Sequence, residues 1–269
     1  MERTVNVHDA NEHQGLSLQE KQAFIFGALP AMAQHTLSFI CSVIGISDPQ
    51  SGRHYGTALR CMLNGRRAIL TALHVIEEAR REPRGLAIST GYGEPPYIFG
   101  GEVNIDPAND LAAYFLPDGY PDIPFWPSAR IDYSLDKLDT DYLFLHGFPG
   151  TTSYSSRLLG GVVSKSLPYG AMRRLENLPS NLQPSQFAVE YDPEGMMDET
   201  GTSQEMIAPH RLSGSPVWRI GVSGRSSQDW KPEDSLLVGI LVQWRPDQKV
   251  LIAASTAEIP PSWRRDLPS

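Results

Sequence analysis

Short apolar runs, rich in β-branched and aromatic residues, recur along most of the chain and are separated by polar segments containing Gly, Pro or Asn-Gly. Runs of this length between turn residues are typical of strands. We therefore expect strands at residues 37–46, 56–62, 68–73, 86–89, 97–105, 111–116, 142–146, 159–164, 186–191, 215–219, 236–244 and 250–255. So many short strands predict an all-β fold, either a barrel or a sandwich.

Two segments have a helical pattern instead. Ser17 followed by Glu20 matches a capping box, so a short helix is expected to begin near Ser17 and to end near Pro30. A second short helix is expected at residues 75–81. Residues 117–137 contain four prolines and few regular patterns, which suits a linker between two halves of the fold. The acidic segment 192–205 is expected to be a loop.

The composition indicates a globular protein and excludes several classes of function. Of the 269 residues, 41% are apolar and 20% are charged. The net charge is −8 and no run of Lys or Arg stands out, so we expect no nucleic-acid partner. No stretch approaches the length of about 18 apolar residues that a membrane span needs, so we expect no membrane partner.

The cysteine count bears on the compartment. Cys41 and Cys61 are the two cysteines of the chain, and so few thiols suit a reducing compartment, which predicts a cytoplasmic protein. A secretory leader is the alternative, because residues 23–33 are apolar and end in an Ala-Met-Ala triplet. The long acidic segment before them argues against it, since a leader begins with a short basic region.

Three residues in a fixed order point to acyl transfer by a serine. His74 follows an apolar strand, Asp110 precedes another, and Ser213 stands in a Leu-Ser-Gly-Ser-Pro turn before a third. A base, an acid to orient it and a hydroxyl in a Gly-containing turn are what a nucleophilic serine requires. The turn could also aim successive backbone N–H groups at one point and so form an oxyanion hole.

Each of these residues also has a simpler interpretation. A histidine after a strand is usually structural, and the Ser213 segment alone reads as a polar turn. Asp110 could form an Asx turn with Asn109, in which case Asp106 would be the substitute acid. His210 is expected to be a loop residue lining the cleft.

Other kinds of site are not indicated. The Gly147–Gly150 segment lacks the lysine that a phosphate-binding loop needs. No pair of His or Cys has the spacing of a metal site. We therefore expect neither a cofactor nor a metal.

Several sequence blocks, taken in order, resemble those of the trypsin-like (chymotrypsin-fold) serine peptidases. The similarity is greatest to their bacterial, disulfide-poor branch related to the HtrA-type proteases. The blocks are Gly56-Thr57-Ala58, Ile69–Val75, Asp110-Leu111-Ala112, Gly147–Gly150, Leu159–Ser164, Ser213–Pro216 and Leu237–Trp244, and together they span roughly residues 37–256.

This resemblance implies two six-stranded antiparallel β-barrels with the site between them. The first barrel would cover residues 37–125 and supply His74 and Asp110. The linker and second barrel would cover residues 126–269 and supply Ser213, and residues 1–36 would be an N-terminal extension with a short helix. In the implied mechanism His74 takes the proton of Ser213, Asp110 orients the imidazole, and the backbone N–H groups of Arg211 and Ser213 bind the oxyanion.

The implied substrate-binding residues are Ile207, Gln243, Trp244 and Arg245. Three departures from the family pattern concern this site. Arg211 stands where the family usually has Gly, and a Cβ there could favour the wrong peptide orientation. Arg245 follows Trp244 where Gly is usual and could narrow the specificity pocket. Ile207 and Met206 lie near the expected pocket floor and favour a small or apolar substrate side chain.

The sequence therefore predicts a serine endopeptidase whose partner is a peptide or protein substrate. The alternative is a protease-fold module that binds extended peptides with weak catalysis. Arg211 and Arg245, which depart from the family pattern, favour this alternative. A latent protease switched on by a regulatory protein partner is a further possibility, with the N-terminal helix and the 192–205 loop as candidate control elements.

Overall fold

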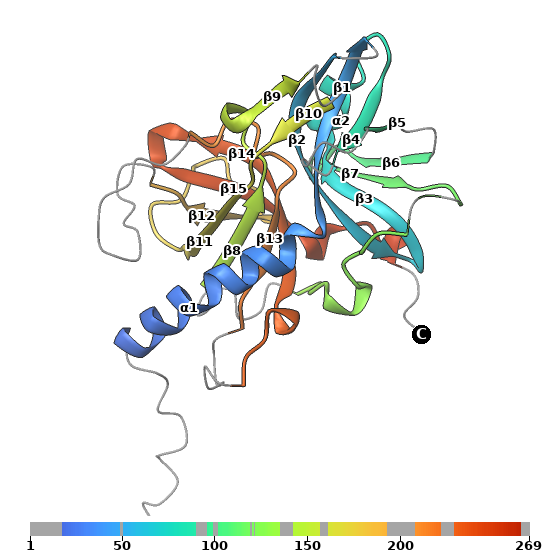
Figure 1. The fold of residues 1–269 in the computed structure, drawn as a ribbon. Coiled ribbons are helices and arrows are strands. Elements are labelled where there is room, and N and C mark those ends of the chain that lie inside the picture. The colour runs from blue at the N-terminus through green and yellow to red at the C-terminus, as the bar shows by residue number, and fades with distance from the viewer. Residues whose placement is uncertain are drawn as a thin grey trace, which may run out of the picture.

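The computed structural model describes residues 18–48, 51–89, 96–98, 102–118, 120, 122–134, 142–156, 161–192, 208–221 and 229–264. Strands dominate this part of the chain, as the apolar runs predicted. They form a large sheet from the first half of the chain, a barrel from the second half, and a separate hairpin (Figure 1).

The first sheet has seven antiparallel strands in the order β5-β4-β1-β2-β3-β7-β6. Its strands are β1 (Ile40–Asp48), β2 (Ser51–Leu63), β3 (Arg66–Ala72), β4 (Leu86–Ser89), β5 (Tyr97–Ile98), β6 (Glu102–Asp106) and β7 (Leu111–Phe115). The closed six-stranded barrel expected here is not confirmed within the described residues, and the strand expected at 97–105 is two strands, β5 and β6, one at each edge of the sheet. Within the described residues the sheet is curled but open, and Ile98 and Ile105 on its edge strands are exposed.

The second half forms the closed six-stranded barrel that was expected. Its order is β11-β12-β15-β14-β13-β8, and each pairing within it is antiparallel. The strands are β8 (Tyr142–Gly147), β11 (Leu167–Arg174), β12 (Gln186–Glu190), β13 (Pro216–Arg219), β14 (Leu236–Arg245) and β15 (Val250–Ser255). The run expected at 159–164 is not part of the barrel, since β10 (Gly161–Ser164) pairs with β9 (Ser153–Ser156) in a hairpin of its own.

The N-terminal helix is longer than its sequence signals predicted. Helix α1 (Leu18–Leu37) continues past Pro30, where we expected it to end. The ring of Pro30 is exposed, whereas Ala28, Met32 and Thr36, spaced at four-residue intervals, are buried. The Thr36 hydroxyl donates to the Met32 carbonyl and lies 2.7 Å from Nδ1 of His146 on β8. Packing of this face against the barrel outweighs the local effect of the proline.

The other helices are short. They are α2 (Leu73–Ala79), α3 (Pro261–Arg264) and the 3₁₀ turns η1 (Ser128–Arg130), η3 (Gly150–Thr152), η4 (Pro232–Asp234), η5 (Pro246–Gln248) and η6 (Thr256–Glu258). Helix α2 corresponds to the helix expected at 75–81 and begins directly where β3 ends.

The proline-rich connection between the halves is bound to both of them. The Trp126 amide donates to the Arg60 carbonyl of β2, and the Asp132 amide donates to the Leu237 carbonyl of β14. Trp126 itself is 1% exposed and packs edge-on against Trp218 of the barrel. The segment is therefore a packed part of the core that holds the two halves together.

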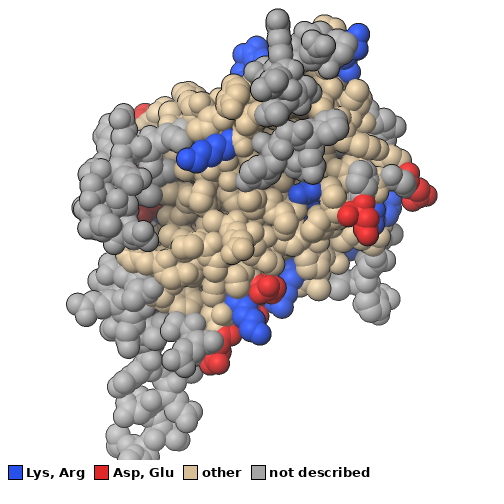
Figure 2. All heavy atoms as spheres, viewed as in Figure 1, with Lys and Arg blue, Asp and Glu red and all other residues tan. Residues whose placement is uncertain are grey.

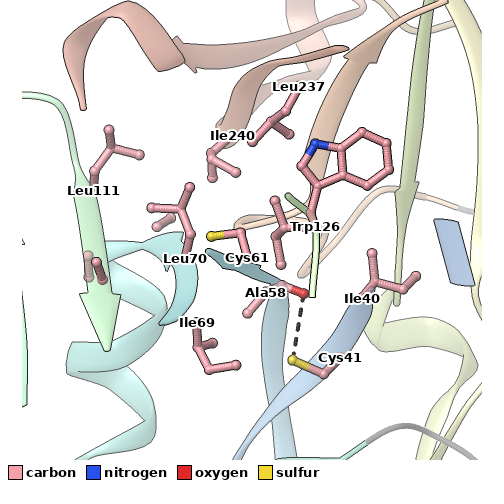
Figure 3. Packing of buried hydrophobic residues seen from close by; sticks show 14 of the residues in the cluster. Ile40, Cys41, Ala58, Cys61, Ile69, Leu70, Leu111, Trp126, Leu237 and Ile240 are labelled. Atoms are coloured by element: carbon pink, nitrogen blue, oxygen red, sulfur yellow. Dashed lines mark hydrogen bonds between the residues drawn. The ribbon is translucent and has the colours of Figure 1, made fainter. Parts of the chain in front are cut away.

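Both cysteines are free and buried (Figure 3). Cys41 Sγ lies 3.6 Å from the Ala58 carbonyl, and Cys61 packs near Trp126 and Leu70. Burial raises the pKa of the Cys41 thiol to about 12, so it stays protonated and serves as a small apolar side chain.

Charged side chains gather toward the margins of the face shown in Figure 2, and uncharged residues cover much of its middle. In the part of the chain that the structure describes, the helices lack the length and apolar character needed to cross a membrane. The same residues contain no group of three or more His, Cys, Asp or Glu able to hold a metal ion.

Candidate active site

The structure joins His74 and Asp110 directly. His74 is the second residue of α2, so the end of a buried strand fixes its backbone. Its Nδ1 lies 2.6 Å from Oδ2 of Asp110, and its backbone N–H donates to Oδ1 of the same carboxylate over 3.0 Å. The preceding N–H, of Leu73, donates to the Asp110 carbonyl. Asp110 thus caps the helix that carries His74 and also orients the imidazole ring.

Asp106 and Asp110 have different roles in the structure. Asp106 accepts hydrogen bonds from the Ala108 amide and the Asn109 side chain, so it forms the local turn. Asp110 follows that turn with a positive φ of 54°, which presents its carboxylate to α2.

The His74–Asp110 pair is partly open to solvent, with side-chain exposures of 38% and 32%. Partial burial lowers the pKa of His74, but the hydrogen bond and charge of Asp110 outweigh it, and Glu78 and Glu77 add to their effect. The net result is a raised pKa, so the protonated imidazolium is stabilised.

Ser213 is the second residue of a tight turn that begins at Leu212, where another tight turn ends. The Leu212 amide donates to the Pro209 carbonyl, and the Ser215 amide donates to the Leu212 carbonyl. The third residue of each turn has a positive φ, 65° at Arg211 and 85° at Gly214, as type II turns require. The Gly214 amide donates to the Leu241 carbonyl of β14, which fixes the second turn to the barrel.

The same turn is in contact with the first sheet. The Thr57 amide of β2 donates to the Ser213 carbonyl over 2.9 Å. A Cβ on Gly214 would lie 1.9 Å from the Thr57 carbonyl oxygen and 2.1 Å from Oγ1 of Thr71. A Cβ on Gly56 would lie 2.7 Å both from the Ser213 carbonyl oxygen and from Cγ2 of Val75. Two glycines therefore allow Ser213 to approach the strand and helix that carry His74.

No hydrogen bond joins the His74 ring to the Ser213 hydroxyl among these described residues. The serine is half-buried, and the peptide that follows it is hydrogen bonded to Thr57 of the first sheet and to Leu241 of the barrel.

The expected oxyanion donors are oriented by a contact that the sequence did not reveal. The Gly150 amide donates to the His210 carbonyl over 2.7 Å. Because a trans peptide directs its C=O and N–H oppositely, the Arg211 N–H faces away from Gly150. Within the described residues neither this N–H nor that of Ser213 has an acceptor. His210 itself is exposed.

Within the described residues, one edge of the implied substrate strand is unpaired next to this turn. Gln243, Trp244 and Arg245 lie on β14 and pair with β15. On the opposite side, β13 pairs with β14 only as far as Ile240, after which the Leu241 amide donates to Ser215. Trp244 packs on Tyr191, and Nε of Arg245 is buried with no hydrogen-bond partner in the described part of the chain. Ile207 and Met206, expected near the pocket floor, lie outside the described residues, as does most of the 192–205 loop.

Comparison with known proteins supports the fold. No family model matches the chain, and no curated protein sequence matches it. Its structure is similar to that of the Rv3671c protease of M. tuberculosis in its active form, with a TM-score of 0.52 and 14% identity over 87% of this chain and 83% of that chain. A mutant of human heparin binding protein matches with a TM-score of 0.51 and 10% identity over 82% and 87% of the two chains.

A mutant of the tobacco etch virus protease matches with a TM-score of 0.47 and 14% identity, over 84% of this chain and 75% of that chain. The structural neighbours are chymotrypsin-fold proteases and related proteins, so the predicted chymotrypsin-like fold is confirmed.

Proposed function

We propose that the protein is a serine-type endopeptidase that uses Ser213 as nucleophile and the His74–Asp110 pair as its base. The observation that carries this proposal is the double contact of one carboxylate with His74, at Nδ1 and at the backbone N–H. It fixes the proton on Nδ1 and leaves Nε2 as the basic nitrogen. A purely structural histidine would not need a partly exposed ring held in this way beside a serine turn.

The chemistry follows from these positions. Nε2 of His74 accepts the Ser213 hydroxyl proton while Oγ attacks the peptide carbonyl, and the resulting imidazolium is stabilised by Asp110. His74 then gives this proton to the leaving amine, which departs as the acyl-enzyme forms. Water, activated by His74 in the same way, hydrolyses the ester and regenerates Ser213.

The oxyanion of each tetrahedral intermediate would be bound by the backbone N–H groups of Arg211 and Ser213. Both N–H groups lack an acceptor within the described residues, so they are available for this role. The Gly150–His210 hydrogen bond also restricts the orientation of the peptide before Arg211, and with it the direction of the Arg211 N–H.

An extended peptide would bind along the free edge of β14. Residues 243–245 have strand-pairing groups on the side where β13 has ended, so a substrate could add there as an antiparallel strand. The scissile bond would then lie near Ser213, because Leu241 is hydrogen bonded to Gly214 and Ser215, the two residues after the serine.

The test is covalent labelling of the purified protein by a fluorophosphonate, which reacts with activated serines. We expect labelling of the wild type and its loss in Ser213→Ala and in His74→Ala. Ser215→Ala is the matched control, because its hydroxyl lies two residues away and is buried without a hydrogen-bond partner among the described residues. Labelling that persists in Ser213→Ala would refute the assignment, and a folded wild type that is not labelled would favour the peptide-binding alternative.

A further inference from the structure

Residues 209–215, which carry the proposed oxyanion donors and are called the oxyanion turn below, include one residue with an unusual conformation for its type. Arg211 has a φ of 65°, in the left-handed region that glycine adopts freely. A side chain with a Cβ opposes this conformation, so an arginine there needs compensating contacts. Without them the His210–Arg211 peptide would tend to rotate and to turn its N–H away from the proposed oxyanion site.

The Arg211 side chain makes such contacts across the interface. Its Nη1 donates to the backbone carbonyl of His54, on β2 of the first sheet. Its guanidinium carbon lies 5.5 Å from the centre of the Tyr55 ring, within the range of a cation–π contact. Its methylene groups fill the space beside Gly150, where a Cβ would come within 2.7 Å of Cδ. The arginine side chain therefore contacts His54, Tyr55 and Gly150, which lie outside the turn.

The surface that receives the arginine is itself held in place. His54 is 3% exposed, and its Nδ1 lies 2.6 Å from the Ser42 hydroxyl of β1. The Tyr55 hydroxyl donates to Glu82, just beyond α2. Both receiving residues are thus fixed to the first sheet, and a side chain bound to them is fixed as well.

We propose that Arg211 is a positioning residue whose side chain clamps the oxyanion turn of the barrel to the first sheet. The peptide before it is then held at two points, through Gly150 at the His210 carbonyl and through β2 at the arginine side chain. The clamp holds the Arg211 N–H ready for the oxyanion, a task that the usual glycine performs without a side chain. This inference rests on the proposed function for its catalytic consequence.

The test compares Arg211→Ala with Arg211→Gly by fluorophosphonate labelling over a range of reagent concentrations. We expect Arg211→Ala to lower the limiting rate by about 10–100-fold with little change in the half-saturating concentration, because an oxyanion donor acts in the transition state. Arg211→Gly should recover most of the rate, since glycine adopts the positive φ without a clamp. If the Arg211 side chain only contributed packing, Arg211→Gly would be labelled no faster than Arg211→Ala.

Arg53→Ala is the matched control. Its guanidinium carbon lies 5.6 Å from the centre of the same Tyr55 ring and its charge repels that of Arg211, but it makes no hydrogen bond to the turn in the described part of the chain. We expect its labelling to match that of the wild type. An Arg211→Ala rate equal to that of Arg53→Ala, or an Arg211→Gly rate as low as that of Arg211→Ala, would overturn the proposal.

Hydrogen exchange of the Gly150 amide tests the clamp without any activity. This N–H is bonded to His210, so release of the turn should expose it. We expect at least about tenfold faster exchange in Arg211→Ala and no change in Arg53→Ala. If the wild type is not labelled, the proposed function fails but this exchange still decides the clamp. Equal exchange in the wild type and in both alanine variants would overturn it.

Discussion

Replacing Gly214 with alanine tests whether the serine turn depends on close approach between the two halves of the fold. The φ of 85° alone should cost an alanine about 1–2 kcal/mol. The added Cβ would also lie 1.9 Å from the Thr57 carbonyl oxygen and 2.1 Å from the Thr71 hydroxyl. These two groups are hydrogen bonded to each other over 2.6 Å in the core, so relief of the clash disturbs a buried bond.

The expected loss of stability in Gly214→Ala combines these contributions. Disrupting a buried hydrogen bond costs about 1–3 kcal/mol. Forcing extra volume into a packed region costs about 1–3 kcal/mol. Because the contributions overlap, we expect Gly214→Ala to lower the free energy of unfolding by about 3–5 kcal/mol.

Gly221→Ala is the matched control for backbone conformation. Its φ is 80°, but among the described residues the nearest atom to a new Cβ is the Asp234 carbonyl oxygen at 4.0 Å. It should therefore lose only the conformational contribution, about 1–2 kcal/mol. Urea unfolding of both variants measures the difference. Equal losses in the two variants would refute the argument that Gly214 is needed for close approach.

Two further predictions concern histidines and pH. The raised pKa of His74 predicts that fluorophosphonate labelling increases with pH through a midpoint above 6.5, and Asp110→Asn should move this midpoint down and slow the labelling; an unmoved midpoint would contradict the role of Asp110. Burial lowers the pKa of His54 to about 4 and that of His146 to about 3, so the unfolded chain binds protons that the folded protein does not as the pH falls below 6.5. Each should therefore remove about 1.6 kcal/mol of stability between pH 6.5 and pH 5. Urea unfolding at both pH values checks this, and His146→Asn should lose about half of the combined pH dependence; an unchanged dependence would show that His146 is not buried as a neutral ring.

The strands that could be predicted from the sequence are those buried on both faces. β7 and β15 are buried along their whole length, so each has a continuous apolar run, and their observed bounds agree with the expectation within about one residue. β11 could not be predicted, because Pro168, Gly170 and its half-exposed side chains resemble a loop. It is a strand because it pairs with β8 over six residues that are distant in sequence.

In the candidate site too, features set by local sequence could be predicted and features set by long-range contacts could not. Short motifs were enough to select His74, Asp110 and Ser213, because each stands beside a recognisable strand or turn. The sequence also showed that Arg211 stands where the resembled family usually has Gly, but it could not show which contacts would hold the arginine. The residues that hold Arg211 are long-range neighbours, since His54 lies 157 positions earlier in the chain. The division of the run at 97–105 into β5 and β6, at opposite edges of the first sheet, likewise depends on pairing with strands distant in the sequence.

The hydrogen bond from Gly214 to Leu241 has a consequence for synthesis. A ribosome completes His74, Asp110 and Ser213 well before it adds Leu241, so the nascent chain contains the proposed catalytic residues without the partner that fixes the serine turn. Under the proposed function, peptidase activity then begins only after β14 has emerged and paired. Late translation of this strand would protect both the growing chain and its neighbours from premature cleavage.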